Sequence, residues 1–71
     1  MKIRFDPKLD IIRIIFRDAP TEESDEEKPG VILDYDADGK LVGLEILNVS
    51  RYAIDLHTVE FAIVEPFRQT E

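Results

Sequence analysis

The chain has 71 residues, a formal net charge of −7, one histidine and no cysteine. This length predicts a single domain over residues 1–71. The absence of cysteine excludes disulfides, and a lone histidine leaves no Cys/His set for structural zinc. A chain this small buries only about 60% of its surface on folding. We therefore expect self-association, as a homodimer, to supply the missing burial.

The acidic balance also limits the classes of partner. A chain at −7 with no Lys/Arg cluster repels phosphate backbones, so we expect neither nucleic-acid nor membrane binding. The stretch MKIRFDPKLD has no apolar run of the signal-peptide kind, and no stretch reaches the ~20 apolar residues of a membrane span. We expect a cytoplasmic protein, which the lack of cysteine fits. A basic protein remains a compatible partner.

The first predicted element is a β-hairpin. Lys2 to Phe5 alternates polar and apolar residues, and Ile11 to Phe16 is rich in β-branched side chains. Asp6-Pro7 lies between them and favours a turn, because proline fixes φ and has no N–H to donate.

A dense acidic run follows, and we predict a solvated loop over residues 18–29. Five of the six residues from Glu22 to Glu27 are acidic, with Pro20 and Pro29 on either side. Like charges at this density repel one another, which disfavours an isolated helix. The functional alternative is a docking segment for a basic partner. Its partner-binding residues would be Glu22, Glu23, Asp25, Glu26 and Glu27.

A second hairpin is predicted from Gly30–Tyr35 and Leu41–Leu47, two further alternating runs. After it the period changes to that of one helix face, which Asn48 or Ser50 could cap. The residues of that face are Val49, Tyr52, Ala53 and Leu56.

Alternation returns over Val59–Val64, which predicts another strand, and residues 67–71 are expected to form a frayed tail. The predicted fold is therefore mainly β (α+β). It is an antiparallel sheet of four or five strands, built from two hairpins, with one short helix near the C-terminus.

The second hairpin contains DYDADGKLVGLE, which matches the calcium-loop pattern D-x-[DN]-x-[DN]-G-x5-E. A calcium loop needs helices on both sides, whereas these flanks favour strands. In an extended strand at ~3.3 Å per residue, Glu45 would lie roughly 20 Å from Gly39 and could not close a cage. We predict a hairpin turn in which Gly39 supplies positive φ. The alternative is a weak divalent-cation site formed by Asp34, Asp36 and Asp38.

No pattern in the sequence points to catalysis. His57 has no cysteine or second histidine beside it, and Ser24 and Ser50 lie in no G-x-S-x-G elbow. The three glycines do not form a phosphate-cradling loop. We expect no catalytic residues, no cofactor and no enzymatic activity.

Two blocks of the sequence carry a family resemblance. Ile3-Arg-Phe-Asp-Pro7 and the longer block PGVILDYDADGKLVGLEIL, residues 29–47, resemble the domain of unknown function 2283 family of short prokaryotic proteins. The resemblance covers about residues 2 to 52. It departs at Asp10-Ile11-Ile12-Arg13, where members more often show Asp-Ala-Leu-Tyr, so no role of that tyrosine carries over.

The resemblance implies a small antiparallel β-domain and no assigned activity. Some members look like the small partner encoded beside toxin-like proteins, which implies an antitoxin-like role. We therefore expect a non-enzymatic protein-binding module whose partner is a basic protein. The alternative function is that of a weak divalent-cation-binding protein using the Asp34–Asp38 turn.

Overall fold

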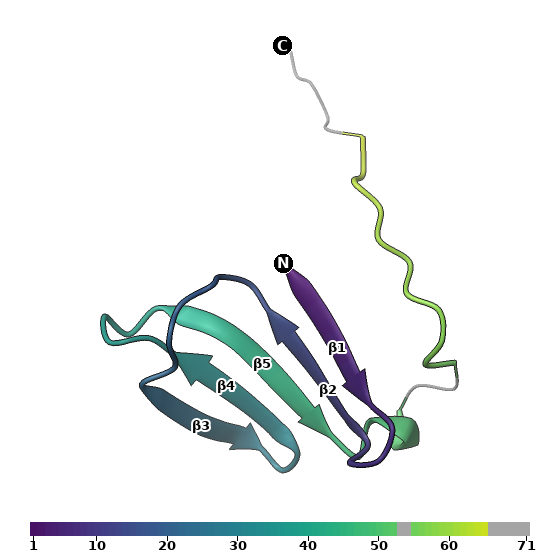
Figure 1. Cartoon of the computed structure of the whole chain (residues 1–71), viewed down its shortest axis with the longest axis horizontal. Helices are drawn as coiled ribbons and strands as arrows, with labels where there is room; N and C mark the ends of the chain where they lie inside the picture. Colours follow the sequence, from purple (N-terminus) through teal and green to yellow (C-terminus); the bar gives the residue numbers. More distant parts are fainter. Residues whose placement is uncertain (53–54, 66–71) are drawn as a thin grey trace.

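The computed structural model describes residues 1–52 and 55–65. They contain one antiparallel sheet of five strands in the order β1-β2-β5-β4-β3 (Figure 1). A single 3-10 turn, η1, follows at Val49–Arg51. The mainly β prediction is therefore confirmed. The strands are β1 (Lys2–Asp6), β2 (Ile11–Ile15), β3 (Glu23–Lys28), β4 (Val31–Tyr35) and β5 (Leu41–Leu47).

Both predicted hairpins are present, β1 with β2 and β4 with β5. In the first turn the Oδ1 atom of Asp6 accepts the backbone N–H groups of Lys8 and Leu9, at 2.9 and 3.2 Å. This side-chain cap explains how the chain reverses just after Pro7.

The acidic segment contains an edge strand, so the predicted loop over residues 18–29 is wrong for Glu23–Lys28. The chain leaves β2, crosses the ends of β5 and β4, and reaches the far edge of the sheet (Figure 1). The N–H of Phe16 donates to the Val42 carbonyl at 2.7 Å, and that of Glu22 to the Tyr35 carbonyl at 2.8 Å. The predicted exposure of the acidic segment to solvent is confirmed for Glu23–Lys28, because every residue of β3 is exposed. Water and salt screen exposed charges, so repulsion does not prevent the strand from pairing.

The short helix is reduced to the η1 turn. Asn48 occupies the N-cap in a left-handed conformation, with φ 52° and ψ 45°, and its side chain makes no capping hydrogen bond. Asp10 takes that role, since its carboxylate accepts the Ser50 N–H at 3.1 Å and the Ser50 hydroxyl at 2.6 Å. Ala53 lies outside the described residues. No described helix is long enough to cross a membrane.

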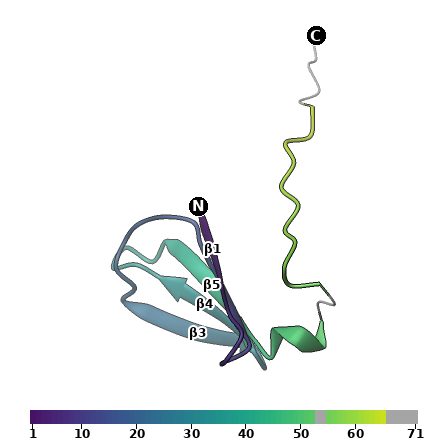
Figure 2. The same cartoon turned by 45° about the vertical axis from the view of Figure 1, so that its right-hand side comes forward.

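The strand predicted over Val59–Val64 is wrong, because residues 55–65 form no strand in the part of the chain that is described. We call residues 55–65 the arm. It is extended and runs apart from the sheet in two views (Figures 1 and 2). The predicted frayed tail, residues 67–71, lies outside the described residues.

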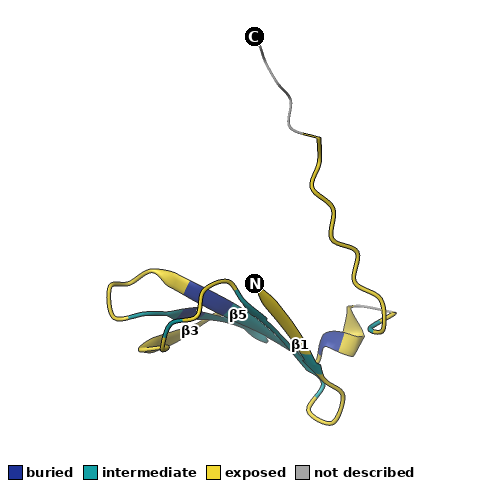
Figure 3. Ribbon diagram, turned by 45° about the horizontal axis from the view of Figure 1, so that its top comes forward, coloured by how far each residue is buried: buried dark blue, intermediate teal, exposed yellow. Residues whose placement is uncertain are grey.

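The sheet is a single layer with little core. Among the described hydrophobic residues only Val42 and Val49 are buried, at 2% and 4% exposure (Figure 3). The register gathers apolar side chains on one side of the sheet, because residues opposite each other share a face. We call this side the apolar face; its residues are Ile3, Phe5, Ile12, Ile14, Val31, Leu33, Leu44 and Ile46.

Candidate protein-binding surfaces

The predicted partner-binding residues lie on and beside an open edge of the sheet. Within residues 1–52 and 55–65, strand β3 pairs only with β4, so its other side carries backbone groups that this part of the chain does not pair. Glu22 lies just before the strand, and Glu27 lies where a bulge shifts the register between Glu26 and Lys28. The structure thus brings all five predicted acidic residues into one stretch.

The pairing with β4 divides these carboxylates between two faces. Glu23 and Asp25 lie opposite Tyr35 and Leu33, on the side of the apolar face. Glu26 lies opposite Ile32 on the other side, and its Oε2 accepts the Gly30 N–H at 2.9 Å. Within the described residues the ion pairs are Arg13–Glu45 and Arg17–Asp36. None of the five carboxylates therefore has a described cation within ion-pair distance.

The Asp-rich turn is the hairpin turn that the sequence predicts. Gly39 has φ +79°, and its N–H donates to the Asp36 carbonyl at 3.0 Å. The Oδ1 atom of Asp36 accepts the N–H groups of Asp38 and Lys40, both at 2.9 Å. Its Oδ2 accepts from the Arg17 Nη1 at 2.6 Å. The Arg17 hydrogen bond, followed by the Lys40 N–H, lowers the pKa of Asp36.

The three aspartates of the cation alternative do not gather. Asp34 is 1% exposed and lies within β4, whereas Asp36 and Asp38 belong to the turn. Among the described residues no three His, Cys, Asp or Glu side chains are placed to hold a metal ion.

We expect a calcium titration to leave the turn unchanged. The ion would have to displace Arg17 from Asp36 and to reach a buried Asp34. The amide chemical shifts of Asp36, Asp38 and Gly39 should stay constant up to about 1 mM calcium, the range of weak protein sites. Saturable shifts at these amides that sodium chloride of equal ionic strength does not produce would revive the cation-binding alternative.

A polar cluster that the sequence did not reveal lies on the face opposite the apolar one. The hydroxyl of Ser24 on β3 donates to the Asp34 Oδ1 at 2.6 Å. Glu45 on β5 is hydrogen-bonded to Asp34, and its Oε2 lies 4.0 Å from the Arg13 Nε on β2. Burial, and then the Asp34 hydrogen bond and charge, raise the pKa of Glu45, against a smaller opposing effect of Arg13.

The Asp34 carboxyl lies close enough to Glu45 to disfavour ionisation of Glu45. The Oδ2 of Asp34 is buried and has no hydrogen-bond donor within the described residues. When Glu45 is protonated, its O–H group can donate to Asp34, and the raised pKa of Glu45 widens the pH range in which it is protonated. The cluster therefore links β3, β4, β5 and β2 through side chains.

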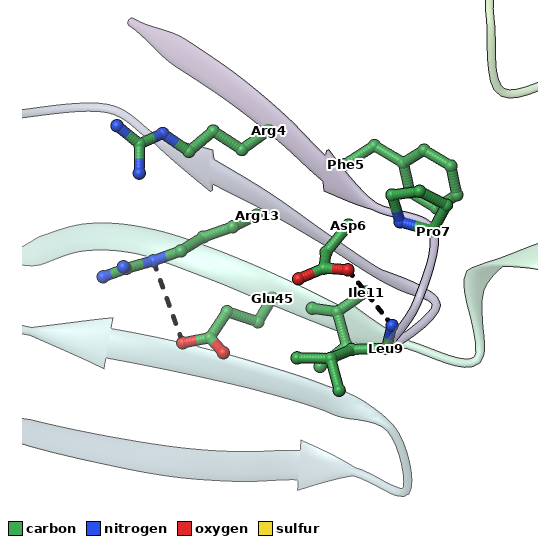
Figure 4. A pocket seen from close by; sticks show the side chains of 8 residues that line it. All are labelled: Arg4, Phe5, Asp6, Pro7, Leu9, Ile11, Arg13 and Glu45. Atoms are coloured by element: carbon green, nitrogen blue, oxygen red, sulfur yellow. Dashed lines mark hydrogen bonds and ion pairs between the residues drawn. The ribbon is translucent and has the colours of Figure 1, made fainter.

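An open depression of about 570 Å³ lies beside this cluster, at the β1–β2 turn. Figure 4 shows the guanidinium groups of Arg4 and Arg13 on one side and the Pro7–Leu9 turn on the other. Arg4 and Arg13 are direct neighbours across the strand pair. This depression has an apolar floor at Ile11 and a charged rim.

The residues considered for catalysis, Ser24, Ser50 and His57, lie apart, and each makes a hydrogen bond to an aspartate that holds the local backbone or strand pair. The Ser24 and Ser50 hydroxyls donate to Asp34 and Asp10. The backbone N–H of His57 donates to the Asp55 Oδ1 at 2.9 Å, which is the first cause of a lowered pKa at Asp55. Neither hydroxyl donates a hydrogen bond to a histidine, the usual base that activates a serine nucleophile.

Comparison with known proteins fits this picture of a β-sheet domain without an assigned chemistry. No curated protein and no solved structure matches the chain. One family model, described as "Protein of unknown function (DUF2283)", matches residues 2–50, which span all five strands. The chain belongs to this family.

Proposed function

We propose that the chain is a non-enzymatic protein-binding module that takes up a basic segment of a partner protein along the β3 edge. The observation that carries the proposal is an open edge strand whose exposed carboxylates have no cation partner within the described residues. In the antitoxin-like form of this function, the bound basic protein is one whose activity the module blocks.

Strand addition supports this mode of binding. An open edge offers a row of backbone donors and acceptors, and an extended peptide can pair with it as an additional strand. Glu23 and Asp25 project on one side and Glu26 on the other. Lysines or arginines on both faces of an added strand would therefore meet carboxylates, and opposite charges across a strand pair are favourable.

The charges also give the edge its selectivity. A second β3 strand presented by another copy carries the same acidic residues and is repelled. A neutral or acidic peptide gains the backbone hydrogen bonds alone, whereas a basic one adds electrostatic attraction and faster association. The module is expected to bind basic segments and to avoid self-pairing at this edge.

The test compares two charge variants as immobilised baits in a native lysate at moderate salt. Glu23→Lys with Asp25→Lys reverses the edge. Asp18→Lys with Asp38→Lys, the surface variant, makes the same net change at exposed positions outside β3, β1 and the arm. We expect the parent and the surface variant to recover one basic protein that the edge variant loses. Binding should also fail near 1 M salt, where the screening length falls to about 3 Å.

Recovery of the same proteins by the edge variant and the parent would contradict the proposal. A protein recovered in this way is then titrated against all three chains by calorimetry. An unchanged dissociation constant for the edge variant would likewise exclude β3 as the binding edge.

A further inference from the structure

The chain exposes more surface than a compact protein of its mass. Its accessible area is 5913 Å², whereas a compact chain of this mass exposes only about 4,500 Å². Its radius of gyration is 14.9 Å, against about 11 Å for a compact domain of this length. The excess is about 1,400 Å² by the same scaling, and both the open sheet and the arm contribute exposed apolar side chains to it.

The apolar face is the first source. An open depression of about 570 Å³ on this face lies between β2, β5, β4 and the η1 turn. It is lined by Ile12, Ile14, Val31, Ile46, Val49 and Tyr52, with Lys28 and Pro29 at the rim. Within the described residues no second layer packs on it: Tyr52 is exposed and Val49 is buried, whereas the four strand residues are only half-buried.

The arm is the second source. Val59, Phe61 and Ile63 alternate along it and are 61%, 70% and 79% exposed. This is the pattern of a strand with one apolar side, yet the described arm pairs with nothing. Phe61 reaches towards β1 only across an open space of about 370 Å³, lined by Met1, Ile3 and Phe61 itself.

We propose that a second copy of this chain covers both surfaces: the apolar faces of two copies stack, and the arm of each copy packs against β1 of the other. A face that contacts its own equivalent is self-complementary, as a two-fold dimer requires. If each chain hides its excess, the interface buries about 2,800 Å² in total, within the ~2,000–5,000 Å² of obligate homodimers.

Charge favours the β1 edge for this contact. Strand β1 carries Lys2 and Arg4, whereas the arm carries Asp55, Glu60 and Glu65. The β3 edge is acidic and would repel the same arm. The dimer therefore uses the apolar face and β1, and it leaves the β3 edge free for the basic partner. The dimer and the binding of a basic partner can thus be tested separately.

The first part of the test measures the dimer dissociation constant by sedimentation for two neighbouring substitutions. Phe61→Asp places a charge on the apolar side of the arm, and Ala62→Asp places the same charge on its other side. Neither position lies in a strand, so neither variant disrupts the sheet. We expect Phe61→Asp to weaken the dimer roughly tenfold or more, about 1.4 kcal/mol, and Ala62→Asp to leave it unchanged.

The second part of the test locates the contact. The chain has no cysteine, so Glu60→Cys gives a single site for a nitroxide spin label. The labelled chain is mixed with an isotope-labelled chain that carries no nitroxide. We expect broadened amide signals at Ile3 and Ile14 of the second chain.

Two results would overturn the proposal. One is a sedimenting mass of 8.2 kDa at concentrations of about 100 µM. The other is a second chain whose amide signals stay sharp, while a separate sample in which one chain carries both the nitroxide and the isotope label shows the broadening; the arm would then pack on its own sheet. An equal effect of Phe61→Asp and Ala62→Asp would also reject the apolar side of the arm as the contact.

Discussion

The substitution Gly43→Ala is expected to destabilise the chain by about 3 kcal/mol or more, at the upper end for an overpacked site. A Cβ at this position would overlap the backbone oxygen of Ile14 and approach the Ile15 Cα to 3.2 Å. Backbone atoms cannot move aside as a flexible side chain can. Relief would require β2 and β5 to separate where they pair. A small domain has only about 5–15 kcal/mol of stability, so much of it would be lost.

Thermal unfolding followed by circular dichroism measures this loss, and Gly39→Ala is the matched control. Gly39 has φ +79°, but a methyl group added there would meet nothing within 4 Å, so this variant reports only the cost of a left-handed alanine. That cost is about 1–2 kcal/mol. If Gly43→Ala lowers the unfolding midpoint no more than Gly39→Ala does, the close approach of β2 to β5 is incorrect.

The substitution Glu45→Gln is expected to stabilise the chain at pH 7 and to have little effect at pH 4. Burial and Asp34 raise the pKa of Glu45 above its usual 4.5, so between pH 4.5 and the raised pKa the folded chain binds this proton more strongly than the unfolded chain does. The stability from this proton is full below pH 4.5 and is lost as the pH rises through the raised pKa. A glutamine keeps the hydrogen bond to Asp34 at every pH, and we expect a gain of about 1 kcal/mol at pH 7.

Urea unfolding at several pH values between 4 and 8 tests this expectation. The control is Asp38→Asn, an equal charge change at an exposed position outside the polar cluster and the arm. A Glu45→Gln chain that is less stable than the parent at pH 7 would show that the ionised carboxylate, paired with Arg13, is the stabilising form. The raised pKa of Glu45 would then be wrong.

Alternating apolar residues predicted both hairpins correctly, but the same alternation over Val59–Val64 predicted a strand that the structure does not contain. Both hairpins follow from alternation with turn residues between, and Gly39 has the positive φ that its turn requires. Strand β3 was missed because every one of its residues is exposed. An edge strand with solvent on both faces has no apolar period to detect.

The polar cluster was missed for a different reason. Asp34 and Glu45 are eleven positions apart and meet only because Asp34 pairs with Gly43 across β4 and β5. That register includes a bulge between Asp34 and Tyr35, which no sequence period indicates. The sequence feature that could have indicated the cluster is a carboxylate within one predicted strand, Asp34, together with a glycine within the next, Gly43. The prediction that Glu22 to Glu27 bind a basic partner stays a prediction, which the charge variants of the β3 edge test.

The dependence of thermal stability on protein concentration tests most directly whether this single-layer sheet is completed by a second copy. Folding that is coupled to association gains stability by mass action as the concentration rises. A dimer predicts an unfolding midpoint that increases steadily over about a hundredfold range of concentration. A midpoint that stays constant over that range, with cooperative unfolding, would show that the sheet is stable alone and would contradict the dimer.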